Sequence, residues 1–168
     1  KYKEGSRDHS IQEENFFKNS NIKYFLCDRA KMYETIEKNL VEFCVERCSC
    51  WFHGRHYLVD AYITDERLKP ILLLANALFY IEQESVRRKH TPEQRLKFRL
   101  KYSRKIVEKI MKKLEAIRLA GNEYGALVHR AVNYILDDKE AFQKFLLDGH
   151  IELHNNTIER MFRHIAIG

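Results

Sequence analysis

One long amphipathic segment, residues 92–120, most strongly limits the folds open to this chain. Thr91-Pro92-Glu93 is a typical helix start, with threonine as the cap and proline at the first helical position. Gly121-Asn122 marks the C-terminal end. The apolar residues follow a 4-3 spacing broken at Ser103, and they are Leu96, Leu100, Val107, Ile110, Leu114 and Ile117. We therefore predict a helix that packs against residues 67–88 as an antiparallel pair, with its basic residues on the outer face.

Shorter patterns on either side of this helix predict the remaining elements. Residues 22–27 and 45–52 are strand candidates, and on the second Cys48, Cys50 and Phe52 would share one face while Trp51 occupies the other. Further helices are expected over residues 11–20, 31–40, 54–64, 67–88, 123–136 and 138–147. Two strands make an incomplete sheet. Either most of the sheet lies ahead of residue 1, or the chain is mainly helical with a small hairpin.

The positive charge of the chain is concentrated in one segment. The 168 residues carry a formal net charge of +6, and residues 87–118 hold 13 Lys/Arg against 3 Asp/Glu. Such a segment is either a solvated helix face or a surface for a polyanion such as nucleic acid.

The cysteines and the apolar runs indicate in which cellular compartment the protein is expected. Four cysteines without a signal-peptide pattern favour a reducing cytoplasm. The longest apolar stretch, residues 71–81, is shorter than the about 20 residues that a membrane span needs, so no membrane partner is expected.

A cluster of soft ligands invites a zinc hypothesis. Its members follow a C-x3-C-x-C-x2-H-x2-H pattern and are Cys44, Cys48, Cys50, His53 and His56. Thiolates and imidazoles are zinc ligands, but this spacing is not that of a zinc finger. Reduced thiols in the core are the main interpretation, and zinc binding is the alternative.

Two acidic residues are candidates for chemistry. Asp28 directly follows an apolar run, at the strand end where α/β active sites gather acidic ligands, although a plain turn aspartate fits too. Glu159 lies three residues after Asn156, which is a capping-box spacing. Alternatively, Glu159 and Arg163 face one cleft, where the carboxylate would bind a divalent ion and the arginine would meet phosphate.

Three segments carry a resemblance to one protein family. Cys50-Trp-Phe-His-Gly-Arg55 resembles the C-W-A-H-x-R signature, and Leu78-Phe-Tyr-Ile-Glu82 the L-Y-x-I-E motif, of transposases of the insertion sequence sixty-six family. Phe145-Leu-Leu-Asp-Gly149 followed by residues 152–168 resembles its F-L-x-D-G…I-D-N-N-x-x-E-R-x-x-R-P-I-A-L-G block. The order and spacing agree over nearly the whole chain.

The resemblance implies an α/β fold leaning mostly to α: a partial ribonuclease-H-like fold with few strands and a long helical insertion. Residues 1–66 would form the partial core, 67–150 the helical insertion, and 151–168 the catalytic C-terminal helix that completes the core. It also implies an Asp-Asp-Glu active site. Asp28 and Tyr33 fit the family's T-D-G-Y-x-x-Y motif, so Asp28 matches the second aspartate and Glu159 the glutamate. Both would bind Mg²⁺ or Mn²⁺, with two ions in the complete site.

DNA-binding residues follow from the resemblance and from the basic helix. His53 and Arg55 match basic positions after the second motif. Around the glutamate, the matching positions are Asn155, Asn156, Arg160 and Arg163. On the basic helix, the lysines that would track the DNA backbone without reading its sequence include Lys101, Lys105 and Lys112.

The chain departs from the family pattern at several positions. Arg29-Ala30 replace Gly-Tyr, and histidines stand at three motif positions: His56, His154 and His164. Nothing in residues 1–27 matches the family's first aspartate. We therefore expect an incomplete or degenerate copy that is inactive by itself.

The function implied by the resemblance is DNA transposition, by metal-dependent phosphodiester cleavage and strand transfer. The expected partners are transposon ends, target DNA and further copies of the chain, in the bacterial cytoplasm and on the nucleoid. The alternative is a non-catalytic DNA-binding or protein-interaction helical module. The catalytic hypothesis predicts that the carboxylates of Asp28 and Glu159 lie roughly 4–8 Å apart.

Overall fold

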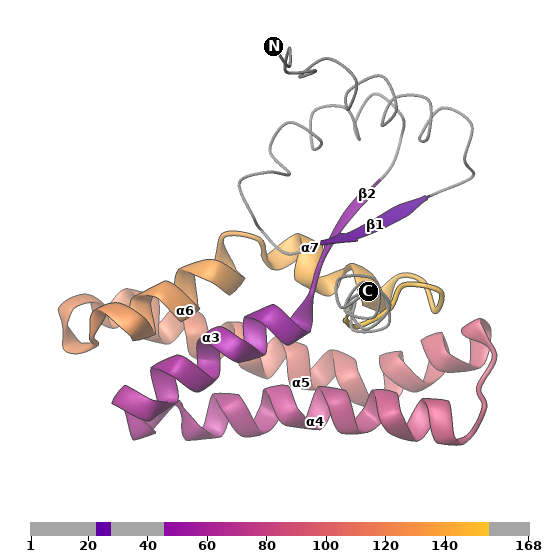
Figure 1. Ribbon diagram of the computed structural model, residues 1–168, viewed down its shortest axis with the longest axis horizontal. Helices are drawn as coiled ribbons and strands as arrows, with labels where there is room; N and C mark the ends of the chain where they lie inside the picture. The colour runs from indigo at the N-terminus through magenta and orange to yellow at the C-terminus, as the bar shows by residue number, and fades with distance from the viewer. Residues whose placement is uncertain (1–22, 28–45, 155–168) are drawn as a thin grey trace, which may run out of the picture.

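The computed structural model describes residues 23–27 and 46–154 (Figure 1). Strand β1 (Tyr24–Cys27) pairs with β2 (Glu46–Ser49) in parallel, with Tyr24 opposite Glu46 and Cys27 opposite Ser49. Both predicted strands are present, and their parallel pairing excludes a hairpin between them. The helices predicted over 11–20 and 31–40 lie outside the described residues.

Helix α3 (Trp51–Thr64) begins three residues before the predicted start, so the strand prediction over residues 50–52 is wrong. The Trp51 side chain is fully buried, its indole N–H donates to the carbonyl of Phe142 at 2.8 Å, and its ring packs edge-on against Phe142. Phe52, predicted to share one face with Cys48, is 37% exposed, whereas Cys48 is buried. Helical geometry turns neighbouring side chains by about 100°, so the alternation expected of a strand stops at Cys50.

Helix α4 (Lys69–Arg87) follows a short 3₁₀ turn, η1 (Glu66–Leu68), and forms an antiparallel pair with α5 (Pro92–Ala120) (Figure 1). The α5 bounds match the prediction. Its start is a capping box, because Thr91 Oγ1 accepts from the Gln94 amide at 3.3 Å and the Gln94 side chain accepts from the Thr91 amide at 2.9 Å. Both ends of the helix are therefore set by local sequence.

The turn between α4 and α5 is a Schellman C-cap. The Lys89 amide donates to the carbonyl of Val86 at 2.9 Å, and the His90 amide donates to that of Ser85 at 3.2 Å. Lys89 adopts φ 54°, the left-handed conformation that this motif requires and that glycine usually supplies. The turn thereby places a lysine at the tip of the helical pair.

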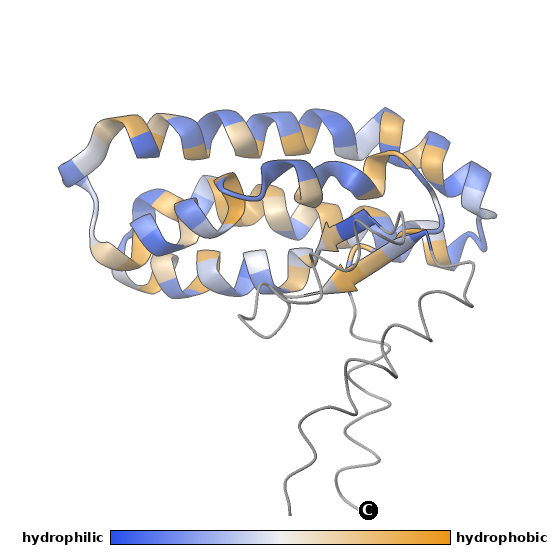
Figure 2. Ribbon diagram, turned by 90° about the horizontal axis from the view of Figure 1, so that it is seen from above, coloured by the Kyte–Doolittle hydropathy of each residue, from blue (hydrophilic) through white to orange (hydrophobic). Residues whose placement is uncertain are grey.

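The remaining elements complete one core. They are η2 (Gly121–Glu123), α6 (Ala126–Leu136), α7 (Lys139–Gln143) and η3 (Lys144–Leu146). Helix α3 packs between α4 and α6, and the fully buried Leu58, Leu78, Ile110, Leu114 and Ile135 join the four long helices. Apolar and polar residues alternate around these helices, as expected where each has one buried face (Figure 2).

The buried face of α5 differs from the prediction in its first half. Val107 and the later apolar positions of the stripe are buried, as predicted. Leu96 and Leu100 are only half-buried, whereas Arg99 and Ser103 are fully buried. The prediction that the basic residues lie on the outer face is therefore wrong for Arg99, for which the structure supplies a carboxylate partner inside the fold.

The described residues are mainly helical with a two-stranded sheet, which confirms an α/β class leaning to α. The likeness to ribonuclease H, and the domain boundaries at 66/67 and 150/151, stay predictions. Across residues 23–27 and 46–154, none of the helices has the length and apolar character needed to cross a bilayer.

Candidate active site and nucleic-acid interface

The carboxyl ends of β1 and β2 meet at one edge of the sheet. Cys27, the last residue of β1, lies opposite Ser49, the last residue of β2. Asp28 follows Cys27 directly in the sequence but lies outside the described residues. The described part of the chain thus brings the residue before Asp28 to the point where β2 passes into α3.

The segment that leads to Glu159 reaches the same point. The Trp51 amide, at the start of α3, donates to the carbonyl of Leu153 at 3.0 Å. Ile151 and Leu153 are buried, so this segment is anchored by its side chains as well as its backbone. Beyond His154, the predicted site residues lie outside the described part: Asn155, Asn156, Glu159, Arg160 and Arg163.

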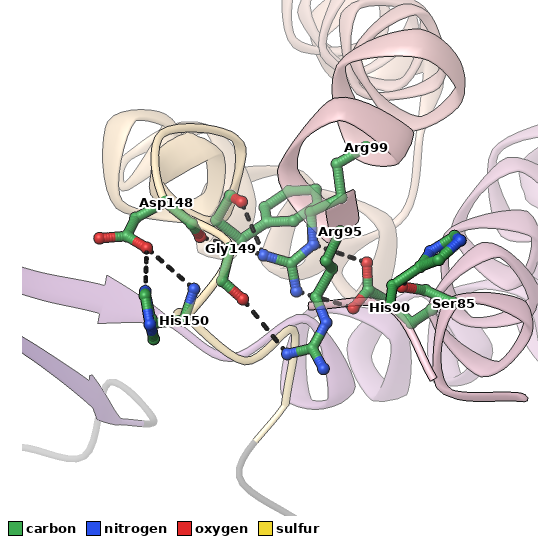
Figure 3. A network of polar contacts seen from close by, with 9 residues as sticks. Ser85, His90, Arg95, Arg99, Asp148, Gly149 and His150 are labelled. Atoms are coloured by element: carbon green, nitrogen blue, oxygen red, sulfur yellow. Dashed lines mark hydrogen bonds and ion pairs between the residues drawn. The ribbon is translucent and has the colours of Figure 1, made fainter. Parts of the chain in front are cut away.

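A buried ion pair, which we call the Glu82–Arg99 clasp, holds the loop that precedes this segment. Figure 3 shows Arg99 beside Asp148 and Gly149 of that loop. Arg99 is fully buried and donates through Nε and Nη2 to the two carboxylate oxygens of Glu82, each at 2.7 Å. Its Nη1 donates to the carbonyls of Phe145 at 2.9 Å and Asp148 at 3.2 Å. One guanidinium therefore joins α4, α5 and the 145–149 loop.

The same loop packs tightly on the start of α5 at Gly149. Arg95 Nη1 donates to the Gly149 carbonyl at 3.2 Å (Figure 3). A Cβ on Gly149 would lie 1.8 Å from the carbonyl oxygen of Pro92, so no larger residue fits without backbone movement. Next to it, Asp148 Oδ1 accepts from the His150 amide at 2.9 Å, and this bond holds the pKa of Asp148 below its usual range.

A cavity of about 400 Å³ lies between the clasp and residues 152–154. The residues that line it include Glu82, Arg95, Arg99, Glu152 and His154. The His154 ring stacks on Phe79 of α4 with centroids 5.8 Å apart. The last described residue before the predicted site segment is thus held against the helical pair.

His53 and Arg55 both lie on α3, near its start. His53 is half-buried, with its ring edge-on to Phe52. Arg55 is half-buried and its Nε donates to the side-chain oxygen of Asn76 at 2.5 Å, which ties α3 to α4. Their predicted contact with DNA stays a prediction.

The described part of the zinc cluster does not form a metal site. Within residues 23–27 and 46–154, no group of three His, Cys, Asp or Glu side chains is placed to hold an ion. Cys48 and Cys50 are buried, as the core-thiol interpretation predicted, and burial raises the pKa of the Cys48 thiol to about 11. Cys44 lies outside the described residues.

The sheet is fastened to the helices by a second charged contact that the sequence analysis missed. Arg47 on β2 forms an ion pair with Asp138 at the start of α7, with Nη1 2.7 Å from Oδ2. Ser49 donates to the same carboxylate. Asp138 is 91 residues from Arg47 in the sequence, and no local pattern marks the pair.

The basic face of α5 carries the predicted DNA-binding lysines. Lys101, Lys105 and Lys112 are all exposed, as predicted for residues that would contact a phosphate backbone. The same is true of Lys97 and Lys109. The excess positive charge of residues 87–118 therefore lies on the surface, with Arg99 as its buried exception.

The described geometry is that of an α/β protein in which a helical unit is clamped to the edge of a parallel sheet. A sequence model described as "Transposase IS66 family" matches residues 4–168, and so the chain belongs to that family. An "Uncharacterized protein y4qI" of Sinorhizobium fredii (strain NBRC 101917 / NGR234) is 28% identical over 123 residues. Those residues are 71% of this chain and 22% of the relative, so the chain spans about a fifth of that protein's length. No solved structure matches.

Proposed function

We propose that this chain takes part in DNA transposition, by metal-dependent cleavage and transfer of phosphodiester bonds. Asp28 and Glu159 would hold two Mg²⁺ or Mn²⁺ ions through their carboxylate oxygens, which are the ligands such hard ions prefer. When bound, the ions would stabilise charge on the attacking and leaving oxygens of the phosphodiester.

One observation carries the proposal: described residues that lie close to the two carboxylates in the sequence converge. Cys27 precedes Asp28 and pairs with Ser49, while Leu153, six residues before Glu159, is bonded to Trp51, two residues after Ser49. Two acidic residues separated by more than a hundred positions thus follow segments that meet at one sheet edge.

The chain's own residues would also orient the site. The Glu82–Arg99 clasp holds the loop before Leu153, and through that loop it would position the segment that leads to Glu159. The complete site would need a third carboxylate. The family resemblance implies that a first aspartate supplies it, and no position of residues 1–27 matches that aspartate. With two carboxylates alone, the ions would be held weakly.

The test of this proposal is removal of each carboxylate in the full-length protein. We expect Asp28→Asn and Glu159→Gln each to weaken Mn²⁺ binding in calorimetry, and, in a protein that also supplies the first aspartate, to lower metal-dependent strand cleavage at least about a hundredfold. Glu108→Gln, an exposed carboxyl on α5, is the matched control and should behave as wild type. Unchanged Mn²⁺ binding by both site variants would refute the proposed centre.

The second candidate function is a non-catalytic DNA-binding or protein-interaction module, which the exposed cationic face of α5 favours. Both candidates predict binding to DNA, but only the first predicts dependence on a metal ion. If the wild-type protein binds duplex DNA equally well with and without Mg²⁺ and cleaves none, the module is the better description.

We propose that the α5 lysines bind the phosphate backbone. Changing Lys101, Lys105 and Lys112 together to glutamate should weaken duplex binding and reduce the slope of log affinity against log salt by about 2 to 3, because each lost phosphate contact removes about 0.9. Fluorescence anisotropy over a salt series measures this. As a matched pair, Lys105→Glu should reduce affinity while Lys69→Glu, exposed at the start of α4, should not. Equal effects would assign the lysines to a solvated face.

The proposal also covers the oligomeric state of the protein and its location in the cell. Joining two transposon ends to one target requires at least two catalytic units, so we propose a homo-oligomer in the working complex, acting on the nucleoid in the bacterial cytoplasm. Light scattering of the protein with and without transposon-end DNA tests the oligomer: a mass that stays monomeric on DNA contradicts it.

A further inference from the structure

A second hollow lies at the tip of the α4–α5 pair. It measures about 330 Å³, near the lower end of the about 300–1,000 Å³ typical of small-molecule sites. We call it the tip groove and define it by the six side chains that carry the argument: Arg88, His90, Lys97, Phe98, Lys101 and Tyr102. No acidic residue is among those that line it.

The cations of the tip groove are available to an anion. Within the described residues, neither Lys97 nor Lys101 forms an ion pair, and both are exposed. Arg88 is held by Glu84, with Nε 2.6 Å from the carboxylate, and yet its side chain remains 52% exposed. Two ammonium groups without a carboxylate partner, of which that of Lys101 lies over the Tyr102 ring, and a partly exposed guanidinium on one small surface attract phosphate.

Two aromatic rings lie among these cations. Phe98 is half-buried and held in place by Arg88, whose guanidinium carbon lies 5.4 Å from the ring centroid, and by the edge of His90. Tyr102 packs edge-on against Phe98 at 4.8 Å and remains 43% exposed. His90 is fixed in turn by the hydroxyl of the buried Ser85, 3.1 Å from Nδ1. The Tyr102 ring is therefore held in position, and the Lys101 Nζ lies 5.1 Å from its centroid, so a base that stacks on that face would displace the Lys101 side chain.

We propose that the tip groove binds unpaired nucleotides of a DNA strand. Phosphates would pair with Lys97 and Lys101, while a base stacks on the ring of Tyr102. A duplex keeps its bases stacked inside, so only an unpaired base can offer its face to the ring. This inference rests on the proposed function for the presence of DNA, and it adds a ligand class that neither the duplex-binding lysines nor the metal-binding carboxylates require.

The experiment measures binding of a labelled oligothymidylate of about twelve nucleotides, and of a duplex of equal length, to the full-length protein by fluorescence anisotropy. Tyr102→Ala should weaken binding of the oligothymidylate about tenfold or more and leave duplex affinity unchanged. Tyr102→Phe keeps the ring and should bind as wild type. Tyr80→Ala removes an exposed tyrosine of α4 outside the groove and is the matched control.

Three outcomes would overturn the inference: oligothymidylate affinity unchanged in Tyr102→Ala, an equal loss in Tyr80→Ala, or equally strong competition by polyglutamate, which would assign the groove to an acidic polypeptide. Thermal unfolding of each variant separates lost binding from lost folding.

If Asp28→Asn cleaves DNA as wild type while Tyr102→Ala loses the oligothymidylate, the proposed function fails and the inference stands. If cleavage depends on Asp28 but Tyr102→Ala binds normally, only the inference fails.

Discussion

Replacing Arg99 with methionine is expected to lower the free energy of unfolding by about 3–5 kcal/mol. The Arg99 side chain is fully buried, and it donates to both oxygens of Glu82 and to two backbone carbonyls. Methionine fills a similar space but donates no hydrogen bond. The change would leave the Glu82 carboxylate, whose side chain is only 12% exposed, without its cation inside the fold.

Urea denaturation followed by far-ultraviolet circular dichroism measures this loss. The matched control is Arg87→Met, because Arg87 also pairs with a glutamate of α4, Glu84, but is 72% exposed. An exposed pair is screened by water, so this control should not change stability measurably. Equal stability of Arg99→Met and Arg87→Met would show that the Glu82–Arg99 clasp does not hold the fold.

A double substitution separates the ion pair from its backbone contacts. Glu82→Leu combined with Arg99→Met removes the buried carboxylate together with the guanidinium, so part of the lost stability should return. The carbonyls of Phe145 and Asp148 still lack the Arg99 donor, so the recovery should be incomplete. Full recovery would assign the whole effect to the charge pair.

The helices could be predicted because their signals are local. The capping box at Thr91 and the glycine at position 121 set the ends of α5 within a few residues of sequence. The apolar spacing from Val107 to Ile117 gave the buried face of its second half. These features need no knowledge of distant residues, and the structure agrees with them.

The elements that differ from prediction depend on distant partners. Trp51 starts a helix and is buried, and its partner Phe142 lies 91 residues away. Arg99 is buried because Glu82 and the loop carbonyls of residues 145 and 148 satisfy its donors. An arginine in an amphipathic pattern is ordinarily a surface residue, so periodicity alone assigned it to the wrong face.

The candidate site was predictable to different degrees. The exposed α5 lysines followed from charge and periodicity, and Asp28 and Glu159 were named by motif resemblance. The resemblance predicted that Asp28 and Glu159 converge, but the contacts that bring their neighbouring segments together, the parallel strand pairing and the Trp51–Leu153 bond, are tertiary and had no signal in the sequence. The tip groove was missed because it combines α5 with a turn whose geometry the sequence did not show.

Gly149→Ala is expected to destabilise the fold by about 3 kcal/mol or more, although it adds a single methyl group. The added Cβ would lie 1.8 Å from the Pro92 carbonyl oxygen and 2.6 Å from its carbon. Both are backbone atoms of the first turn of α5, so no side-chain rotation relieves the clash. The 145–149 loop would have to move away, which would also lengthen the Arg95 and Arg99 bonds to its carbonyls. Thermal and urea unfolding measure the loss.

The same glycine-to-alanine change at two other positions should cost less stability, because the surroundings there are less crowded. At Gly54 the added Cβ would lie 2.9 Å from a ring carbon of Phe142, a side chain that can yield slightly, so the loss should be smaller than at Gly149. At Gly125 nothing lies within 4 Å, and Gly125→Ala should stay within about 1 kcal/mol of wild type. The clash at Gly149 would displace the loop that leads to Leu153, whose carbonyl accepts a hydrogen bond from the Trp51 amide. Gly149→Ala should therefore also speed hydrogen exchange at the Trp51 amide. A Gly149→Ala protein as stable as Gly125→Ala, with that amide still protected, would mean that the close packing of this loop on α5 neither stabilises the fold nor orients the segment toward Glu159.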